Sequence, residues 1–449
     1  MARLMVLAIL LVLVVLPFTP VAGKIKRALM DLRSGKTSVR QIIKEVPREV
    51  VKEVPRVVER IVEKEVQPPL PSAFVPKTDV DVTKLFNGIK IETKLQTTEG
   101  SFASLERENP DAYQVKFQID VKVPRANQSI AELSRINPEL PKVLPGLEQL
   151  LPTSKVSGFY HKLYQNKATN IERDLTRLNK LLSRDNFFDC ETILELTHPS
   201  SARKALLIQT DMDVVADGSD GDRAEDLEDY ISMSDYYQPM TSYFWKKQTK
   251  TPNPLLPRWE EKLRDATAAF AVKGLSAERN RQLKSQIDTL KLEISDLKSH
   301  SSLIADTDPF IVISLVFRGY TEQNPFTPQL GDYAVVIHNN QILPAICGDY
   351  GPSVKMGEAS LRIARQVNPK ATPYVRGEDD LKATYLIFPG TAKKPNGPPN
   401  LEEWRTMCIK YLNEIGGIGA GATVHEWVDL IKWKREFVGP PWPPPKPRK

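Results

Sequence analysis

The stretch Ala334-Val-Val-Ile-His338-Asn339-Asn340-Gln341-Ile-Leu-Pro-Ala-Ile-Cys347-Gly348-Asp349 decides the fold. It contains two short apolar runs rich in β-branched residues, and a pair of asparagines lies between them. Such runs are typical of buried strands, and Asn-Asn is a turn signal, so the stretch predicts a β-hairpin. Two further apolar runs, at 310–317 and 383–388, predict additional buried strands.

The second strand of this hairpin leads into Gly348-Asp349-Tyr-Gly-Pro-Ser-Val-Lys-Met-Gly357-Glu358-Ala-Ser360. Two carboxylates therefore follow each other closely, each beside a glycine. General acid–base catalysis needs such a pair, in environments that separate the two pKa values. Residues 361–367 have a helical pattern, and a helix N-terminus would favour ionised Glu358. This argument favours Glu358 as base and Asp349 as acid; a turn and a helix cap are the alternative interpretation.

A second acidic segment lies upstream, at Asp211-Met-Asp213-Val-Val-Ala-Asp217-Gly218. Residues 211–235 contain ten Asp or Glu and a single basic residue, Arg223. Such a segment would attract a polycation; a solvated acidic loop and a calcium site at Asp213, Asp217, Asp220 and Asp222 are the alternatives. The spacing does not fit an EF-hand. Tyr243 and Trp245 follow, and their rings could stack on sugars or lie in the core.

Together these segments resemble glycoside hydrolase family 75, the fungal-type chitosanases, over about residues 185–245 and 303–390. The matching elements are Met212-Asp213 with Asp217-Gly218, Thr241-Ser242-Tyr243, Gly348-Asp349, and Gly357-Glu358-Ala359-Ser360. The resemblance implies that Asp349 and Glu358 are the essential pair and that the anomeric carbon is inverted. We accordingly expect Asp211, Asp213, Asp217 and Tyr243 to bind substrate, with no metal and no cofactor.

The expected architecture is α+β, with an antiparallel, barrel-like β core and helical insertions. The hydrolase domain is expected at 80–438. It includes a strand at 115–123, helices at 159–184, 401–415 and 423–438, and a helical insertion at 255–300. In that insertion apolar residues recur at steps of four and three: Leu283, Ile287, Leu290, Ile294 and Leu297. This pattern suits a helical hairpin packed on the domain, or a dimerising coiled coil; the oligomeric state stays open.

The N-terminal region has the composition of a targeting segment followed by a spacer. Residues 1–23 predict a signal peptide, and the apolar residues 4–22 would alternatively form a membrane anchor. Residues 24–72 form a Pro- and charge-rich stalk, and residues 439–449 a Pro-rich tail. Both interpretations of residues 1–23 place the domain in a secreted or extracytoplasmic location, tethered or free.

The net charge of +6 does not indicate a nucleic-acid partner. Residues 24–64 contain 12 Lys or Arg and 6 Asp or Glu, which leaves the rest of the chain nearly neutral. Three cysteines exclude a disulfide-dense scaffold. The sequence therefore predicts an inverting hydrolase of chitosan or a related β-1,4-linked amino-sugar polymer. The alternative is a non-catalytic module that binds cell-wall glycan and is displayed on the stalk.

Overall fold

The computed structural model describes residues 101–109, 111, 121–175, 177–181, 183–223 and 241–431. All described residues belong to the unit 60–449. The expected signal or anchor (1–23), stalk (24–72) and tail (439–449) lie outside them, as does most of the strand expected at 115–123. No described helix has the length and apolar character needed to cross a membrane.

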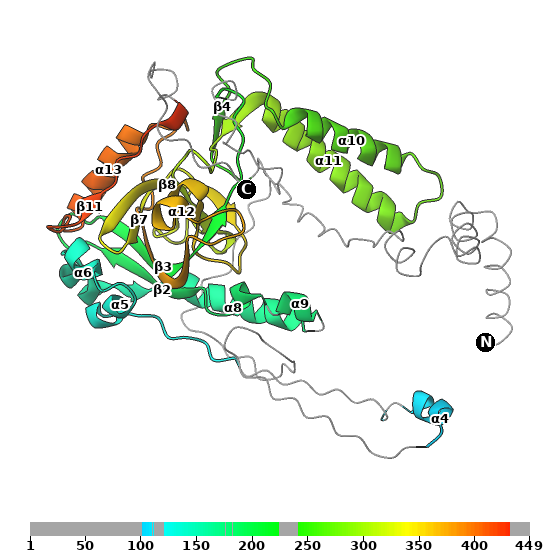
Figure 1. Cartoon of the computed structure of the whole chain (residues 1–449), viewed down its shortest axis with the longest axis horizontal. Helices are drawn as coiled ribbons and strands as arrows, with labels where there is room; N and C mark the ends of the chain where they lie inside the picture. The colour runs from blue at the N-terminus through cyan, green and yellow to red at the C-terminus, as the bar shows by residue number, and fades with distance from the viewer. Residues whose placement is uncertain are drawn as a thin grey trace. The chain divides into compact units, whose positions relative to one another are not determined.

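The described chain contains both helices and strands (Figure 1). The helices are α4 (Ala103–Glu108), α5 (Ile130–Ile136), α6 (Leu140–Val143), α7 (Leu147–Leu150), α8 (Gly158–Arg173), α9 (Leu178–Leu181), α10 (Leu256–Phe270), α11 (Ala277–Ser299), α12 (Leu361–Val367) and α13 (Leu401–Glu414). The strands are β1 (Lys155–Val156), β2 (Cys190–Thr197), β3 (Lys204–Val215), β4 (Phe244–Lys246), β5 (His300–Ser302), β6 (Phe310–Ser314), β7 (Tyr333–His338), β8 (Gln341–Gly351), β9 (Glu358–Ser360), β10 (Glu378–Ile387) and β11 (Thr423–Val424). Short 3₁₀ helices are η2 (Leu151–Thr153), η3 (Arg184–Asn186) and η5 (Leu315–Phe317).

Six strands close into a barrel in the order β3–β10–β7–β8–β6–β9 and back to β3. Closure leaves these strands without a free edge. The β7–β8 hairpin is present as predicted, with its turn at Asn339 and Asn340. The expectation of a barrel-like core in an α+β fold is therefore confirmed.

The expectation that this core is antiparallel is only partly right. Four of the six pairings are antiparallel, but β6 pairs with β8, and β3 with β9, in parallel. Strands β3 and β9 are distant in sequence, and strand β7 lies between β6 and β8 along the chain. The sequence predicts the local hairpin, whereas these long-range pairings depend on how the complete chain packs.

Alternation along the strands separates two apolar cores. All six barrel strands contribute to the inner core, for example Ile208, Ile311, Ala345, Ala359 and Tyr385. The outward-facing residues pack against helices: α13 lies along β7 and β8 (Figure 1), where the thiol of Cys408 contacts Ala334 O at 3.2 Å. The inner core is filled by side chains.

The helical predictions are confirmed with one exception. The expected helix at 159–184 is α8 followed by α9, and the insertion is the hairpin of α10 and α11. Residues 423–429 are not helical: Thr423 N donates to Asn340 O at 3.0 Å and His425 N to Ile342 O at 2.8 Å, which forms β11 against β8. Pairing with the edge of the β7–β8 hairpin here outweighs the amphipathic pattern.

The apolar positions of α11 are covered within the chain. Ile287, Leu290, Ile294 and Leu297 form one cluster with residues of α10 that include Trp259 and Ala266. The helical hairpin is therefore present, with these apolar positions packed between its own two helices, and the oligomeric state stays open.

Candidate active site

A β-bulge at Gly348 aims Asp349 outward. Cys347 pairs with Ile311 of β6 and faces the inner core, whereas the next pair joins Asp349 to Val312, so Gly348 is an extra residue in β8. Bulges re-aim the side chain that follows them. A Cβ atom at Gly348 would lie 2.5 Å from the Phe310 ring, so this close approach requires glycine. The glycine that precedes Asp349 thus determines which face its carboxyl group reaches.

Glu358 lies in the same row of outward-facing side chains. It starts β9 and pairs with Asp213 of β3 on one side and with Val312 of β6 on the other, and Val312 in turn pairs with Asp349. Residues in register on neighbouring strands project to the same face. Asp349 and Glu358 are two strand spacings apart, about 10 Å between Cα atoms.

The carboxylate of Glu358 also leans towards β8. A Cβ atom at Gly351, two residues beyond Asp349, would lie only 2.2 Å from Glu358 Oε2. Glycine at this position therefore leaves the space that the carboxylate occupies. The charge of Glu358 reaches Asp349, whose pKa it helps to raise.

Glu358 does not lie in the first turn of α12, as the sequence suggested. It belongs to β9, and Ser360 caps α12 by accepting from Ile363 N at 3.4 Å. The helix-dipole argument for an ionised Glu358 therefore fails. Burial raises the pKa of Glu358, the positive charge of Lys355 opposes this rise, and the negative charge of Asp213 adds to it.

Asp349 has a protonation equilibrium near neutrality. Burial raises its pKa to about 7, and the charges of Asp217 and Glu358 add to the rise. The side chain of Thr241 and the backbone N–H of Tyr350, which donates at 2.7 Å, lower it again without cancelling the effect of burial. A carboxyl group that is still protonated near pH 7 is suited to general acid catalysis.

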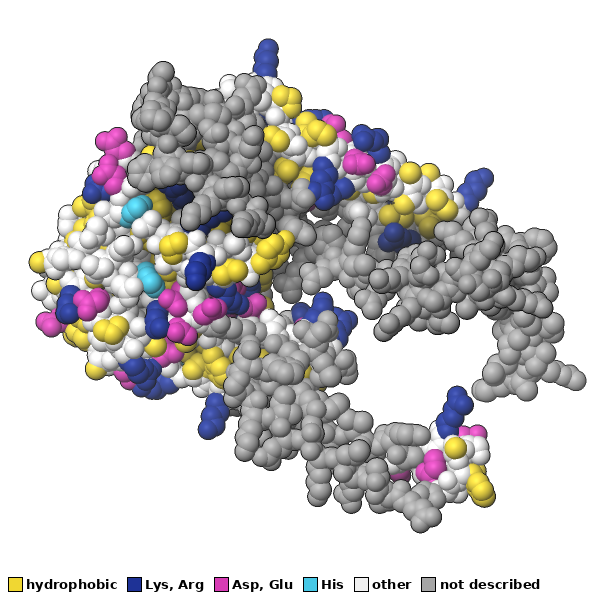
Figure 2. Space-filling model, viewed as in Figure 1, with side chains coloured by type: hydrophobic (Ala, Val, Ile, Leu, Met, Phe, Trp, Pro, Cys, Tyr) yellow, Lys and Arg dark blue, Asp and Glu magenta, His cyan; other side chains and the backbone are white. Residues whose placement is uncertain are grey.

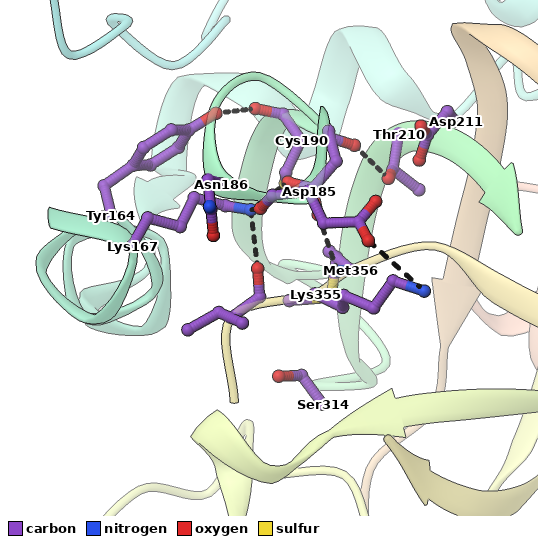
Figure 3. Close-up of polar contacts among 12 residues, drawn as sticks. Tyr164, Lys167, Asp185, Asn186, Cys190, Thr210, Asp211, Ser314, Lys355 and Met356 are labelled. Carbon is purple, nitrogen blue, oxygen red and sulfur yellow. Dashed lines mark hydrogen bonds and ion pairs between the residues drawn. The ribbon is translucent and has the colours of Figure 1, made fainter. Parts of the chain in front are cut away.

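Two cations lie among the acidic side chains of this face. Lys355 Nζ is 2.7 Å from Asp213 Oδ2 and 3.3 Å from Glu358 Oε1. Arg376 Nη1 is 2.7 Å from Asp213 Oδ1 and 2.5 Å from Asp211 Oδ2. Both cations also contact Asp185, and Figure 3 shows Lys355 extending towards it.

The other predicted site residues have different surroundings. Asp213 lies in the row itself, and Asp217 is close enough to raise the pKa of Asp349. Asp211 is fully buried and forms an ion pair with Arg376, whose side chain is 24% exposed. Tyr243 is 7% exposed, and its hydroxyl donates to Gly397 O at 3.2 Å. Tyr243 packs in the apolar core on the outside of the barrel. Its role in substrate binding stays a prediction.

Part of the acidic segment has a structural role. Asp220 is fully buried against Arg223, which also pairs with Asp308. Asp222 accepts hydrogen bonds from Gln248 N at 2.9 Å and Thr249 N at 2.8 Å. Glu225, Asp226, Glu228, Asp229 and Asp235 lie outside the described residues. Within the described part of the chain, no three His, Cys, Asp or Glu side chains are arranged to hold a metal ion.

Sequence reasoning did not identify Lys355, Arg376, Asp185, Lys167 or Asp189. Lys355 lies in the sequence between Asp349 and Glu358. A lysine between two candidate catalytic acids is the signal that could have identified it. Arg376 is 165 residues away from Asp211 in sequence, so no local pattern links them. Lys167 and Asp189 form a fully buried ion pair at 2.8 Å, and Figure 3 shows Lys167 reaching the segment that carries Lys355.

Two carboxyl groups in contrasting environments on one face of a scaffold are typical of glycoside hydrolase sites. Residues 212–420 match the family described as fungal chitosanase of glycosyl hydrolase group 75. The chain thus contains a domain of this family of chitosanase glycoside hydrolases, and the resemblance noted in the sequence is confirmed. No curated protein matches the chain.

Proposed function

We propose that the domain hydrolyses chitosan, or a closely related β-1,4-linked amino-sugar polymer, with inversion at the anomeric carbon. The observation that carries the proposal is the single outward-facing row in which Asp349 and Glu358 are separated by Val312. The family supports a glycosidic substrate. The different surroundings of Asp349 and Glu358 support different roles for them, one as general acid and the other as general base.

In the proposed reaction Asp349 is the general acid. Its pKa of about 7 keeps it protonated in mildly acidic solution, so it donates this proton to the leaving glycosidic oxygen. Glu358 is the general base and takes a proton from a water molecule that attacks the anomeric carbon from the opposite face. The hydroxyl of this water becomes the new anomeric hydroxyl, and the leaving sugar departs with the proton of Asp349. Inversion needs room for water between the carboxyl groups, which are then about 6.5–9.5 Å apart.

The remaining acidic groups of the face suit a cationic glycan. Asp213 is 10% exposed at its side chain and Asp185 23%. Asp213 is the β3 member of the row, and Asp185 shares Lys355 and Arg376 with it. The sugar ammonium groups of chitosan would find negative charge there. On the face shown in Figure 2 acidic and basic side chains are intermingled, so steering would be local to the site. We also propose that the domain acts outside the cytoplasm, because residues 1–23 have the composition of an export signal or anchor.

The direct test compares reducing-end release from chitosan, chitin and peptidoglycan side by side. We expect the fastest release from chitosan. Release from none of the three, together with retained binding to one, would instead support a non-catalytic glycan-binding module.

The stereochemistry has its own test. Proton NMR during the first minutes of hydrolysis should detect the α-anomer of the new reducing end, because inversion of a β-linkage gives that product. Initial accumulation of the β-anomer would refute the inverting mechanism while leaving the substrate assignment intact.

A further inference from the structure

Lys355 is enclosed by three acidic side chains that come from three separate elements. Its Nζ lies 2.7 Å from Asp213 Oδ2 of β3, 3.3 Å from Glu358 Oε1 of β9 and 3.6 Å from Asp185 Oδ2 of η3. We call Asp185, Asp213 and Glu358 the carboxylate cage. The Lys355 side chain is 22% exposed, so water screens this cage only in part.

The backbone on both sides of Lys355 is anchored. Lys167 Nζ donates to Val354 O at 2.6 Å, and Met356 N donates to Asp189 Oδ2 at 3.1 Å. Lys167 and Asp189 are themselves a buried pair with side chains 2% exposed (Figure 3). A buried pair with one hydrogen bond to each neighbour of Lys355 fixes the direction in which the lysine leaves the chain.

The charges around Glu358 make Lys355 its compensating cation. The groups that face Glu358 are Asp213 of β3, Asp185 of η3, Asp349 of β8, Tyr385 of β10 and the cation Lys355. Arg376 pairs with Asp185, Asp211 and Asp213. Among the described residues, Lys355 is the cation that forms an ion pair with Glu358. Without Lys355, the acidic neighbours would disfavour ionisation of the Glu358 carboxyl group.

We propose that Lys355 is a positioning residue for the general base: its anchored ammonium group fills the carboxylate cage and keeps Glu358 ionised and oriented towards the attacking water. This inference rests on the proposed function. It assigns to the cation inside the carboxylate cage a role in the reaction beyond holding the loop in place.

The role predicts a change in pH dependence. Burial and acidic neighbours raise the pKa of Glu358, whereas Lys355 lowers it. The pKa of Lys355 itself is raised by Glu358, Asp213 and Asp185 against the effect of burial, so it remains charged at every working pH. An opposite charge at this distance typically lowers the pKa of a carboxyl group by about 1–3 units. Lys355→Met removes that charge, so the acidic limb of kcat/KM should move to higher pH by about 1–3 units.

The experiment measures kcat/KM on chitosan from pH 4 to pH 8 in the full chain. Lys355→Arg keeps the positive charge and should keep the acidic limb within about half a unit of wild type. Lys382→Met is the matched control, because Lys382 forms an exposed 2.8 Å pair with Asp380; its limb should not move. Lys355→Gln replaces Lys355→Met if the latter does not fold, and the same shift is expected.

Addition of methylammonium to Lys355→Ala gives a second readout. The small cation should enter the emptied cage and return the limb towards its wild-type position. Uniform loss of activity at every pH, with an unmoved limb and no recovery by methylammonium, would overturn the inference and leave Lys355 a structural residue. An inactive wild-type chain would overturn the proposed function and this inference together, whereas an active wild type with an unmoved limb in Lys355→Met overturns this inference alone.

Discussion

Removal of Lys167 probes the buried pair that anchors the active-site segment. Lys167 Nζ lies 2.8 Å from Asp189 Oδ1, and both side chains are 2% exposed. The same ammonium donates to the carbonyls of Asp185 and Val354. Lys167→Met keeps most of the side-chain volume but leaves the carboxyl group of Asp189 buried without its cation.

The expected magnitude follows from burial. Breaking a buried pair by removing one partner costs about 3–5 kcal/mol, because the remaining charge cannot be solvated. This loss is a large part of the 5–15 kcal/mol typical of a folded domain. Lys382→Met is the matched control: the Lys382–Asp380 pair has the same 2.8 Å distance but side chains 51% and 71% exposed. Exposed pairs contribute about 0–1 kcal/mol.

The loss should depend on pH in a defined direction. Burial already raises the pKa of Asp189, and Lys167 opposes that rise. Without Lys167 the folded-state pKa rises further above the unfolded value. A group of this kind destabilises the folded state increasingly as pH rises through the interval between the two values. The penalty of Lys167→Met is therefore largest at neutral and alkaline pH and shrinks towards about pH 3, where Asp189 is largely protonated in both the folded and the unfolded state.

Urea unfolding followed by tryptophan fluorescence at several pH values measures this penalty. A loss at pH 7.5 no greater than that of Lys382→Met, or a loss that grows as the pH falls, would refute the reasoning.

Three further predictions concern the rest of the chain. A chain that begins at residue 73 should fold and keep its specific activity on chitosan, since residues 1–72 have the composition of a targeting segment and spacer; loss of folding would show that the stalk packs on the domain. Replacing Glu225, Asp226, Glu228 and Asp229 with Gln or Asn should flatten the salt dependence of activity on chitosan, because attraction between charges is screened over ~8 Å at physiological salt. Asp220 and Asp222 are kept, since they bind Arg223 and the backbone near Thr249, and an unchanged salt profile would indicate a solvated acidic loop. Finally, burial raises the pKa of Asp349 to about 7, so its ionisation destabilises the folded state as pH rises. Asp349→Asn should therefore raise the unfolding midpoint at pH 8 relative to wild type and change it little at pH 4; equal effects at both pH values would contradict that pKa.

The features that the sequence predicted are those encoded locally. The β7–β8 hairpin, the α10–α11 pair and the α12 and α13 helices each follow from apolar periodicity and turn residues within a short window. Barrel closure could not be predicted this way. It depends on β9, a strand of three residues that pairs with β3 and β6, both distant in sequence.

The same contrast between local and long-range determinants holds for the active site. The glycines beside Asp349 and Glu358 marked both residues, but the orientation of Asp349 depends on a bulge against Phe310 of another strand. The expected helix dipole at Glu358 was wrong because β9 intervenes before α12. Burial and the neighbouring Lys355, which only the folded chain defines, set the environment of Glu358 instead.

The central claim is that Asp349 and Glu358 carry out the hydrolysis. The most direct measurement is turnover of chitosan by Asp349→Asn and Glu358→Gln, each checked for folding by its thermal transition. Removing a general acid or base typically lowers the rate by a factor of ~10²–10⁴, and we expect such a loss in both variants. Glu403→Gln, on α13 beside Lys393, is the matched control and should retain wild-type turnover. Near-wild-type turnover by either folded variant would contradict the account and place the chemistry on other residues.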